Sequence, residues 1–113
     1  MPSLLYAGEN DTIVIYNRAA NGDLERRAAV PLPRPCRSLC FAPDRYHLYL
    51  ATNGDPDDAA KPALILTFAV DPATGALSQV GDGVPVPKVP AYVTTDRSGR
   101  WLLAAAYNSP GHW

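Results

Sequence analysis

The chain has 113 residues, of which 47% are hydrophobic and 19% are charged, a composition typical of a folded domain rather than a disordered segment. Ten Lys and Arg against eleven Asp and Glu leave a net charge of −1, so we expect neither nucleic acid nor a membrane as a partner. The start lacks the basic and apolar regions of a signal peptide, and the longest uncharged apolar stretch, Ala63–Val70, is too short to span a bilayer, which favours a cytoplasmic location.

Short segments rich in β-branched and aromatic residues, each bounded by Gly, Pro, Asn or Asp, predict nine β-strands. In chain order, these strands are expected at residues 3–8, 12–17, 24–30, 36–42, 47–52, 63–70, 77–80, 91–95 and 100–106. No stretch shows the apolar period of an amphipathic helix. The connectors at 17–22 and 71–75 contain Gly22 and Gly75, which can adopt positive φ where a hairpin turn closes. The sequence therefore predicts an all-β chain.

The chain repeats itself with a spacing of 54 residues. The segment VPLPR at 30–34 returns as VPVPK at 84–88, since 84 − 30 = 54, and residues 47–51 correspond to 101–105 at the same offset. Upstream, Tyr6 and Leu50 correspond at only 50 − 6 = 44, which indicates that the polar segment 53–62 is an insertion. Four short strands in a repeat of about 45 residues are typical of one blade of a β-propeller.

Two segments resemble elements of a known family. PAYVTTDRSGRWLL at 90–103, followed by AYN at 106–108, resembles the P-x-x-V-x-x-D-x-x-G-R-[FYW]-L and A-N-Y-N elements of the seven-bladed β-propeller lactonase family. APDRYHLYL at 42–50 resembles the family's S-P-D-x-R-x-L-Y-V element, although Arg45 and Tyr46 stand where the family usually has a glycine. The resemblance covers nearly the whole chain and implies about two four-stranded antiparallel blades of a seven-bladed β-propeller.

The resemblance also implies a division of the chain into blade segments. Residues 1–45 are expected to form a first blade without its inner strand, together with the inner strand of the next blade; residues 46–95 form the second blade, and residues 96–113 begin a third. Seven such blades need on the order of 300 residues, so the chain is interpreted as an N-terminal fragment. Its open edges, at 3–8 and 100–106, predict self-association.

The two cysteines are not expected to form a disulfide or a metal site. Cys36 and Cys40 lie in one predicted strand, where four residues separate them by roughly 13 Å, beyond the limit of about 7 Å for a disulfide. With only two histidines in the chain, this C-x-x-x-C pattern does not indicate zinc. The acidic segment 53–58 lacks the spacing of a calcium loop. We expect no metal and no cofactor.

One face of the blades is expected to carry the functional site. The loops that follow the second strand of each blade and the loops that precede the first strand emerge on this face. They lie beside the inner strands at 36–42 and 91–95. The residues that could converge around one pocket on this face are Arg34, Arg37, Lys88, Tyr92, Tyr107, Asn108 and His112. Of these, the predicted substrate-binding residues are Arg37, Tyr92, Tyr107, Asn108 and Lys88.

Simpler roles remain open for these residues. Arg34 and Lys88 also fit solvated loop charges, and Tyr92, Tyr107 and Asn108 also fit structural positions at a blade cap or an Asx turn. By resemblance, Arg37 stands where the family's inner strands often have Arg, followed by Ser38 in a position where the family has His.

The resemblance implies a lactonase that hydrolyses a sugar-derived lactone, with 6-phosphogluconolactone as the expected substrate. Such an ester hydrolysis needs a water activated by a base, donors for the oxyanion, and Arg or Lys for a substrate phosphate. No residue is assigned as the base, which is expected beyond Trp113. Two alternatives stay open: a muconate-type lactonizing cycloisomerase on a similar ring, and a non-catalytic propeller that serves as a binding platform.

Overall fold

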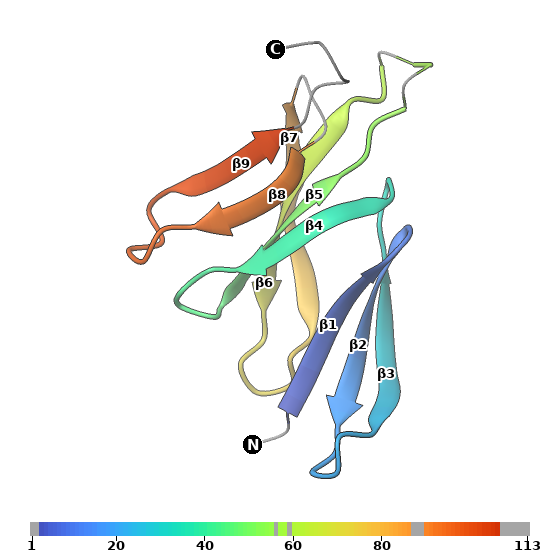
Figure 1. Ribbon diagram of the computed structural model, residues 1–113, viewed down its shortest axis with the longest axis vertical. Coiled ribbons are helices and arrows are strands. Elements are labelled where there is room, and N and C mark those ends of the chain that lie inside the picture. Colours follow the sequence, from blue (N-terminus) through green and yellow to red (C-terminus); the bar gives the residue numbers. More distant parts are fainter. Residues whose placement is uncertain (1–2, 56, 59, 87–89, 107–113) are drawn as a thin grey trace.

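The computed structural model describes residues 3–55, 57–58, 60–86 and 90–106, and the regular structure in this part of the chain is antiparallel β-sheet throughout (Figure 1). The strands are β1 (Ser3–Glu9), β2 (Thr12–Arg18), β3 (Leu24–Pro31), β4 (Cys36–Phe41), β5 (His47–Thr52), β6 (Ala63–Val70), β7 (Leu77–Val86), β8 (Pro90–Thr95) and β9 (Leu102–Ala106). All nine predicted strands are confirmed. The described residues contain no helix that could cross a membrane.

One strand is longer than its sequence suggested. β7 was expected to end at Val80, before two glycines, but it continues to Val86. Its pairing with β6 steps from Val80, opposite Thr67, to Val84, opposite Ile65, so residues 81–83 form a bulge opposite Leu66. Gly81 and Gly83 adopt φ of 74° and 90° in this bulge. The glycines therefore bend the strand rather than end it.

The strands form three separate sheets, and each sheet is built from strands that follow one another in the chain. The first sheet has the order β1-β2-β3, the second β4-β5-β6-β7, and the third β8-β9. β4 contacts β1 of the first sheet and β8 of the third, so the second sheet lies between the other two (Figure 1). The division into blade segments 1–45, 46–95 and 96–113 stays a prediction.

The core lies on the central strands of the two larger sheets. In the second sheet, Leu48 and Leu50 of β5 pair with Phe68 and Leu66 of β6, and all four side chains are buried. Ile13 of β2 belongs to the same apolar cluster, so the cluster joins the first sheet to the second. Each fully buried side chain of this size contributes about 1.5–3 kcal/mol relative to exposure, which makes this cluster the main source of stability.

A second contact between these sheets depends on Tyr6 of β1. Its hydroxyl donates a 2.5 Å hydrogen bond to the carbonyl oxygen of Gly75, in the turn between β6 and β7. Its ring meets Phe41 of β4 edge to face, with ring centroids 5.1 Å apart. Partial burial raises the pKa of Tyr6 above its usual value, although Arg27 acts in the opposite direction. The turn can approach Tyr6 this closely because residue 75 has no side chain.

The turn between β4 and β5 carries Arg45, a residue that stands where the family usually has a glycine. Arg45 adopts a φ of 64°, close to the 73° of Gly99, which stands 99 − 45 = 54 residues later in the repeat. Arg45 therefore takes the left-handed conformation that a glycine takes in the equivalent turn, so the two turns share one geometry despite the difference in sequence.

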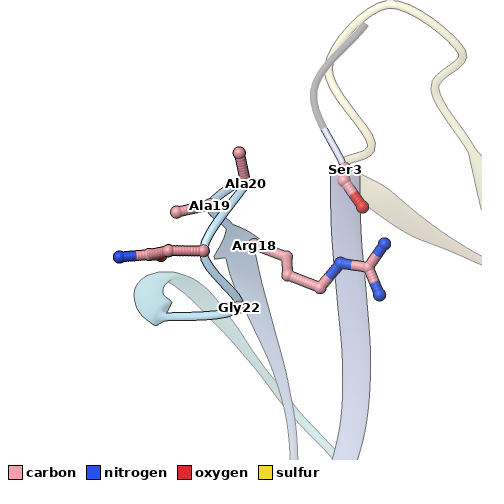
Figure 2. A pocket seen from close by; sticks show the side chains of 6 residues that line it. Ser3, Arg18, Ala19, Ala20 and Gly22 are labelled. Carbon is pink, nitrogen blue, oxygen red and sulfur yellow. The ribbon is translucent and has the colours of Figure 1, made fainter.

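Substitution of Gly75 tests the contact with Tyr6. Gly75 and Gly22 both have positive φ, so alanine at either position costs about 1–2 kcal/mol in backbone strain. Gly22 lies in an open turn where a Cβ would meet nothing within 4 Å (Figure 2). At position 75 a Cβ would overlap Leu4 and lie 2.8 Å from the Tyr6 hydroxyl, which adds about 1–3 kcal/mol.

We therefore expect Gly75→Ala to lower the free energy of unfolding, measured by urea titration, distinctly more than the control Gly22→Ala. Equal losses in the two variants would show that Leu4 and Tyr6 move aside at no cost, so that their close approach to residue 75 does not constrain the fold.

The conformation of Arg45 yields a second prediction. Arg45→Gly removes a left-handed strain of about 1–2 kcal/mol and adds about 0.5–1 kcal/mol of backbone entropy cost, so it should stabilise the protein by about 0.5–1 kcal/mol. Arg26→Gly, in the extended strand β3, should instead destabilise it. Thermal unfolding of both variants is the measurement, and a loss of stability in Arg45→Gly would contradict the expectation.

Candidate functional site

The candidate site is centred on the first strands of the second and third sheets, β4 and β8, which pack against each other. The backbone N–H of Val93 on β8 donates a 3.2 Å hydrogen bond to Ser38 Oγ on β4. Arg37 directly precedes Ser38, and Tyr92 directly precedes Val93. The structure therefore places Arg37 and Tyr92 on adjacent strands, at the two residues next to the link between them.

Both strands carry a bulge at the same point of the repeat. The pairing of β4 with β5 shifts between Cys36 and Ser38, which leaves Arg37 as the extra residue. The pairing of β8 with β9 shifts between Pro90 and Tyr92, which leaves Ala91 as the extra residue, and 91 − 37 = 54. A bulge releases one residue from the ladder and redirects its side chain. Arg37 is accordingly exposed. Tyr92 follows the bulged residue, stays paired with Ala105 and is 61% exposed.

The connection that leads into β4 is fixed by the turn between β1 and β2. The N–H of Cys36 donates a 2.6 Å hydrogen bond to the carbonyl of Asn10, and the N–H of Leu32 donates one of 2.7 Å to the carbonyl of Asp11. Gly8 of β1 lies against Cys36 so closely that a Cβ at this position would overlap its sulfur. These contacts hold the chain on both sides of Arg34 and immediately before Arg37.

Arg34 has a surrounding that the sequence did not indicate. The side chain was expected to be a solvated loop charge, but it is partly buried. Its Nε atom is buried and has no hydrogen-bond partner within the part of the chain that the structure describes. A buried donor without an acceptor costs about 1–3 kcal/mol, so this nitrogen needs an acceptor close to it.

The other predicted binding residues cannot be placed. Lys88, Tyr107 and Asn108 lie outside the described residues, as does His112. Arg37 and Tyr92 are thus the two predicted substrate-binding residues whose positions are defined. Arg34, in the connection that leads into β4, adds a second guanidinium group.

Two cavities lined by described residues lie at the other end of the sheets from Arg37 and Tyr92. One, of about 360 Å³, is lined by Leu4, Tyr6, residues 44–46 and residues 70–75. A second, of about 370 Å³, is lined by Ser3 and residues 18–22, and Figure 2 shows Arg18 extending toward β1 there. The first lies at the β4–β5 and β6–β7 turns and the second at the β2–β3 turn. These turns are opposite the β1–β2 and β3–β4 connections (Figure 1). Neither cavity includes Arg37 or Tyr92.

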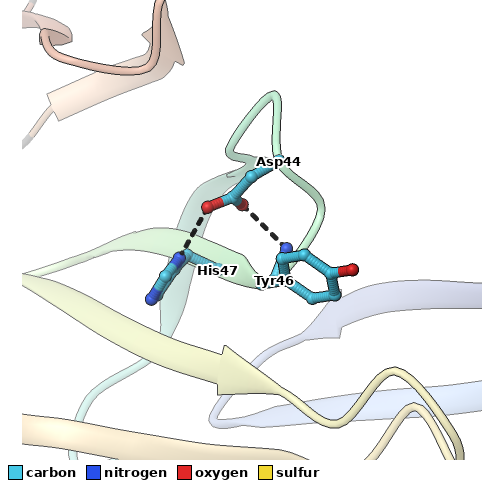
Figure 3. A network of polar contacts seen from close by, with 3 residues as sticks. All are labelled: Asp44, Tyr46 and His47. Carbon is cyan, nitrogen blue, oxygen red and sulfur yellow. Dashed lines mark hydrogen bonds and ion pairs between the residues drawn. The ribbon is translucent and has the colours of Figure 1, made fainter.

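At this opposite end, Asp44 makes hydrogen bonds within the β4–β5 turn. The Asp44 carboxylate accepts a 2.8 Å hydrogen bond from the Tyr46 N–H and lies 3.1 Å from His47 Nδ1 (Figure 3). The Tyr46 N–H, more than His47, lowers the pKa of Asp44 below its usual value. Asp44, Tyr46 and His47 therefore form a local hydrogen-bond network in the β4–β5 turn.

The described residues show no candidate metal centre. No group of three or more His, Cys, Asp or Glu among them could hold a metal ion. Cys36 and Cys40 are free thiols, as expected, and burial raises the pKa of both. By sequence, β4 and β8 carry no His, Asp or Glu, so neither strand supplies a catalytic base of those types.

The link between β4 and β8 can be tested through one hydrogen bond. Ser38→Ala should accelerate hydrogen exchange of the Val93 amide about tenfold, because loss of a hydrogen bond worth about 1–1.5 kcal/mol corresponds to roughly that factor. Ser78→Ala, on the exposed part of β7, is the control and should leave Val93 unchanged. Exchange can be followed by NMR. Unaltered protection of Val93 in Ser38→Ala would show that Ser38 does not hold the strands together.

Comparison with known proteins gives relatives along nearly the whole chain. The 6-phosphogluconolactonase of Serratia proteamaculans is 30% identical over 111 residues, which cover 96% of this chain and 30% of that protein. The 6-phosphogluconolactonase of Enterobacter sp. is 25% identical over 101 residues, covering 89% of this chain and 28% of the relative. The chain thus spans less than a third of the length of these curated relatives.

Solved structures give the same fold. A Bacteroides fragilis protein, proposed to be a 6-phosphogluconolactonase, superposes with a TM-score of 0.72 at 21% identity, covering 93% of this chain and 32% of that one. A Bacteroides uniformis protein proposed to have the same activity superposes with a TM-score of 0.72 at 23% identity, covering 91% and 29%. At these identities the superpositions establish the fold, so the predicted all-β propeller fold is confirmed.

The family itself follows from a match that is independent of any single relative. Residues 5–111 match the family model for the seven-bladed β-propeller lactonases, so nearly every described strand contributes to the match. This chain belongs to the seven-bladed β-propeller lactonase family.

Proposed function

We propose that the propeller to which these strands belong hydrolyses a sugar-derived lactone and that its substrate is 6-phosphogluconolactone. The observation that carries the proposal is the family match over residues 5–111, together with curated relatives that are named 6-phosphogluconolactonase. Because the chain covers less than a third of those relatives, the activity belongs to a ring of which these strands form one part.

The reaction is an ester hydrolysis that needs no cofactor. A water adds to the lactone carbonyl carbon, the ring C–O bond breaks, and the products are a carboxylate and a hydroxyl group on one open chain. The protein must hold the substrate, accept a proton from the water and stabilise the oxyanion. Since β4 and β8 carry no His, Asp or Glu, we expect the base on another inner strand of the ring.

Within this reaction, the residues of β4 and its connection fit substrate binding. Arg37 is exposed at the bulge of an inner strand, and Arg34 has a buried Nε without a partner among the described residues. Guanidinium groups bind phosphate oxygens through paired, charge-assisted hydrogen bonds, so we assign these two residues to the phosphate of the substrate. Tyr92 on the neighbouring strand would contact the lactone. Lys88, Tyr107 and Asn108 stay predicted contacts.

The same proposal includes the blade division and the location. Residues 1–45 would hold a first blade that lacks its inner strand, together with the inner strand of the next blade; residues 46–95 would form the second blade, and residues 96–113 would begin a third. The location would be the cytoplasm, where thiols such as Cys36 and Cys40 stay reduced.

The decisive experiment uses the protein that contains the whole ring and measures lactone hydrolysis as proton release at constant pH, with 6-phosphogluconolactone and unphosphorylated gluconolactone as substrates. Hydrolysis of the phosphorylated lactone above its spontaneous rate is expected. Background rates would remove the proposed activity; consumption of a muconate instead would favour the cycloisomerase, and binding without turnover would favour the platform.

Arg37→Ala should raise KM for the phosphorylated lactone about 10–100-fold, because a charged hydrogen bond is worth about 1.5–3 kcal/mol. KM for gluconolactone should change little, since that substrate has no phosphate. Arg26→Ala, on the exposed strand β3, is the matched control. Equal effects on both lactones would remove the phosphate role of Arg37 while leaving the activity itself intact.

A further inference from the structure

The cavity of about 360 Å³ at the β4–β5 and β6–β7 turns is formed between the first and second sheets. Its walls are Leu4 and Tyr6 of β1, residues 44–46 and residues 70–75. Leu4 and Tyr6 share one face of β1, since alternate residues of a strand point the same way. That face is turned to the second sheet, because the Tyr6 ring contacts Phe41 of β4. The cavity therefore lies between two sheet faces and not along an edge of β1.

The lining and the size of this cavity suit a small molecule with an apolar body. Its apolar walls come from both sheets and are supplied by Leu4, Tyr6, Val70, Pro72 and Ala73. A volume of about 360 Å³ is near the lower end of the range of about 300–1,000 Å³ that small-molecule sites occupy. Such sites combine an apolar lining with a few polar groups that orient the ligand. The polar groups of the lining therefore decide which ligand fits.

The two carboxylates among the described lining residues are engaged by the turns themselves. Asp44 accepts a hydrogen bond from the Tyr46 N–H (Figure 3). One oxygen of Asp71 accepts hydrogen bonds of 2.8 Å and 3.3 Å from the N–H groups of Ala73 and Thr74. Hydrogen bonds from backbone N–H groups stabilise a carboxylate and offset part of its charge. These two side chains therefore hold the turns in shape.

Arg45 is the one basic residue among the described residues that line the cavity. Its guanidinium has no hydrogen bond or ion pair within that part of the chain. Arg45 also has a φ of 64°, whereas glycine, as Gly99, occupies the equivalent turn. A residue with a side chain is strained in this conformation, and such strain is characteristic of functional sites. The guanidinium is thus the charge that the cavity offers to a ligand, and it calls for an anion.

We propose that this cavity binds a small organic carboxylate, whose charged group pairs with the Arg45 guanidinium and whose apolar body lies between Leu4 and Val70. The planar guanidinium matches the two oxygens of a carboxylate through paired hydrogen bonds. A phosphate group would also fit this fork, but the apolar walls favour a ligand with a hydrocarbon body. The site lies at the opposite end of the sheets from Arg37, so it does not depend on the proposed lactonase activity.

The test is an NMR titration of the amide signals of the protein that contains the whole ring. The probes are benzoate, its uncharged counterpart benzamide, and inorganic phosphate. Benzoate should shift the signals of residues 44–46 and 70–75 in a saturable way. Benzamide should bind at least about tenfold more weakly, because it lacks the charge that pairs with the guanidinium. Inorganic phosphate should also bind at least about tenfold more weakly, because it has no apolar body to bury.

Arg45→Gly is the variant that removes the guanidinium and keeps the turn, since glycine adopts the same left-handed conformation at Gly99. It should weaken benzoate binding at least about tenfold. Arg97→Ala is the matched control, because Arg97 is an exposed arginine in the β8–β9 turn and does not line the cavity. Its substitution should leave benzoate binding unchanged.

Four results would overturn the proposal. They are equal binding of benzoate and benzamide, equal binding of benzoate and phosphate, undiminished benzoate binding by Arg45→Gly, and benzoate-induced shifts at residues 34–37 in place of the two turns. The same spectra show whether each variant is folded. Because the measurement is binding and not turnover, failure of the proposed lactonase activity would leave its outcome unaffected.

Discussion

The structure depends on the fact that no single sheet can bury its own apolar side chains. Leu48, Leu50, Leu66 and Phe68 cover one another across β5 and β6, but the cluster is complete only with Ile13 of the neighbouring sheet. Antiparallel sheets are stable when one or both faces are covered by another layer. Each sheet therefore covers a face of its neighbour, and the stability of the fold depends on the contacts between sheets.

Those contacts are also the part that the sequence could not predict. Strand alternation determines which side chains share a face, but it does not say which face of another sheet will cover them. The hydrogen bond from Tyr6 to Gly75 joins residues 69 positions apart, and only the folded chain reveals it. The partial burial of Arg34 escaped prediction for the same reason. Arg34 lies in the connection between β3 and β4, and hydrogen bonds from this connection to the β1–β2 turn are seen only in the folded chain.

What the sequence did predict followed from its composition and from its repeat. The nine strands were found from composition and turn residues, and the offset of 54 related segments of the second and third sheets. The same offset relates features that composition could not show: the bulges at Arg37 and Ala91, and the left-handed residues Arg45 and Gly99. Arg45 shows why a repeat is the stronger signal. Its residue type argued against the turn, yet it adopts the left-handed conformation of Gly99, its counterpart in the repeat.

The candidate site results from the same constraint. Arg37 and Tyr92 lie on strands that begin their sheets, and such strands can surround a ligand only when several sheets stand side by side. The strands β4 and β8 supply guanidinium and hydroxyl groups but no carboxylate or imidazole, so the chemistry of hydrolysis requires further strands.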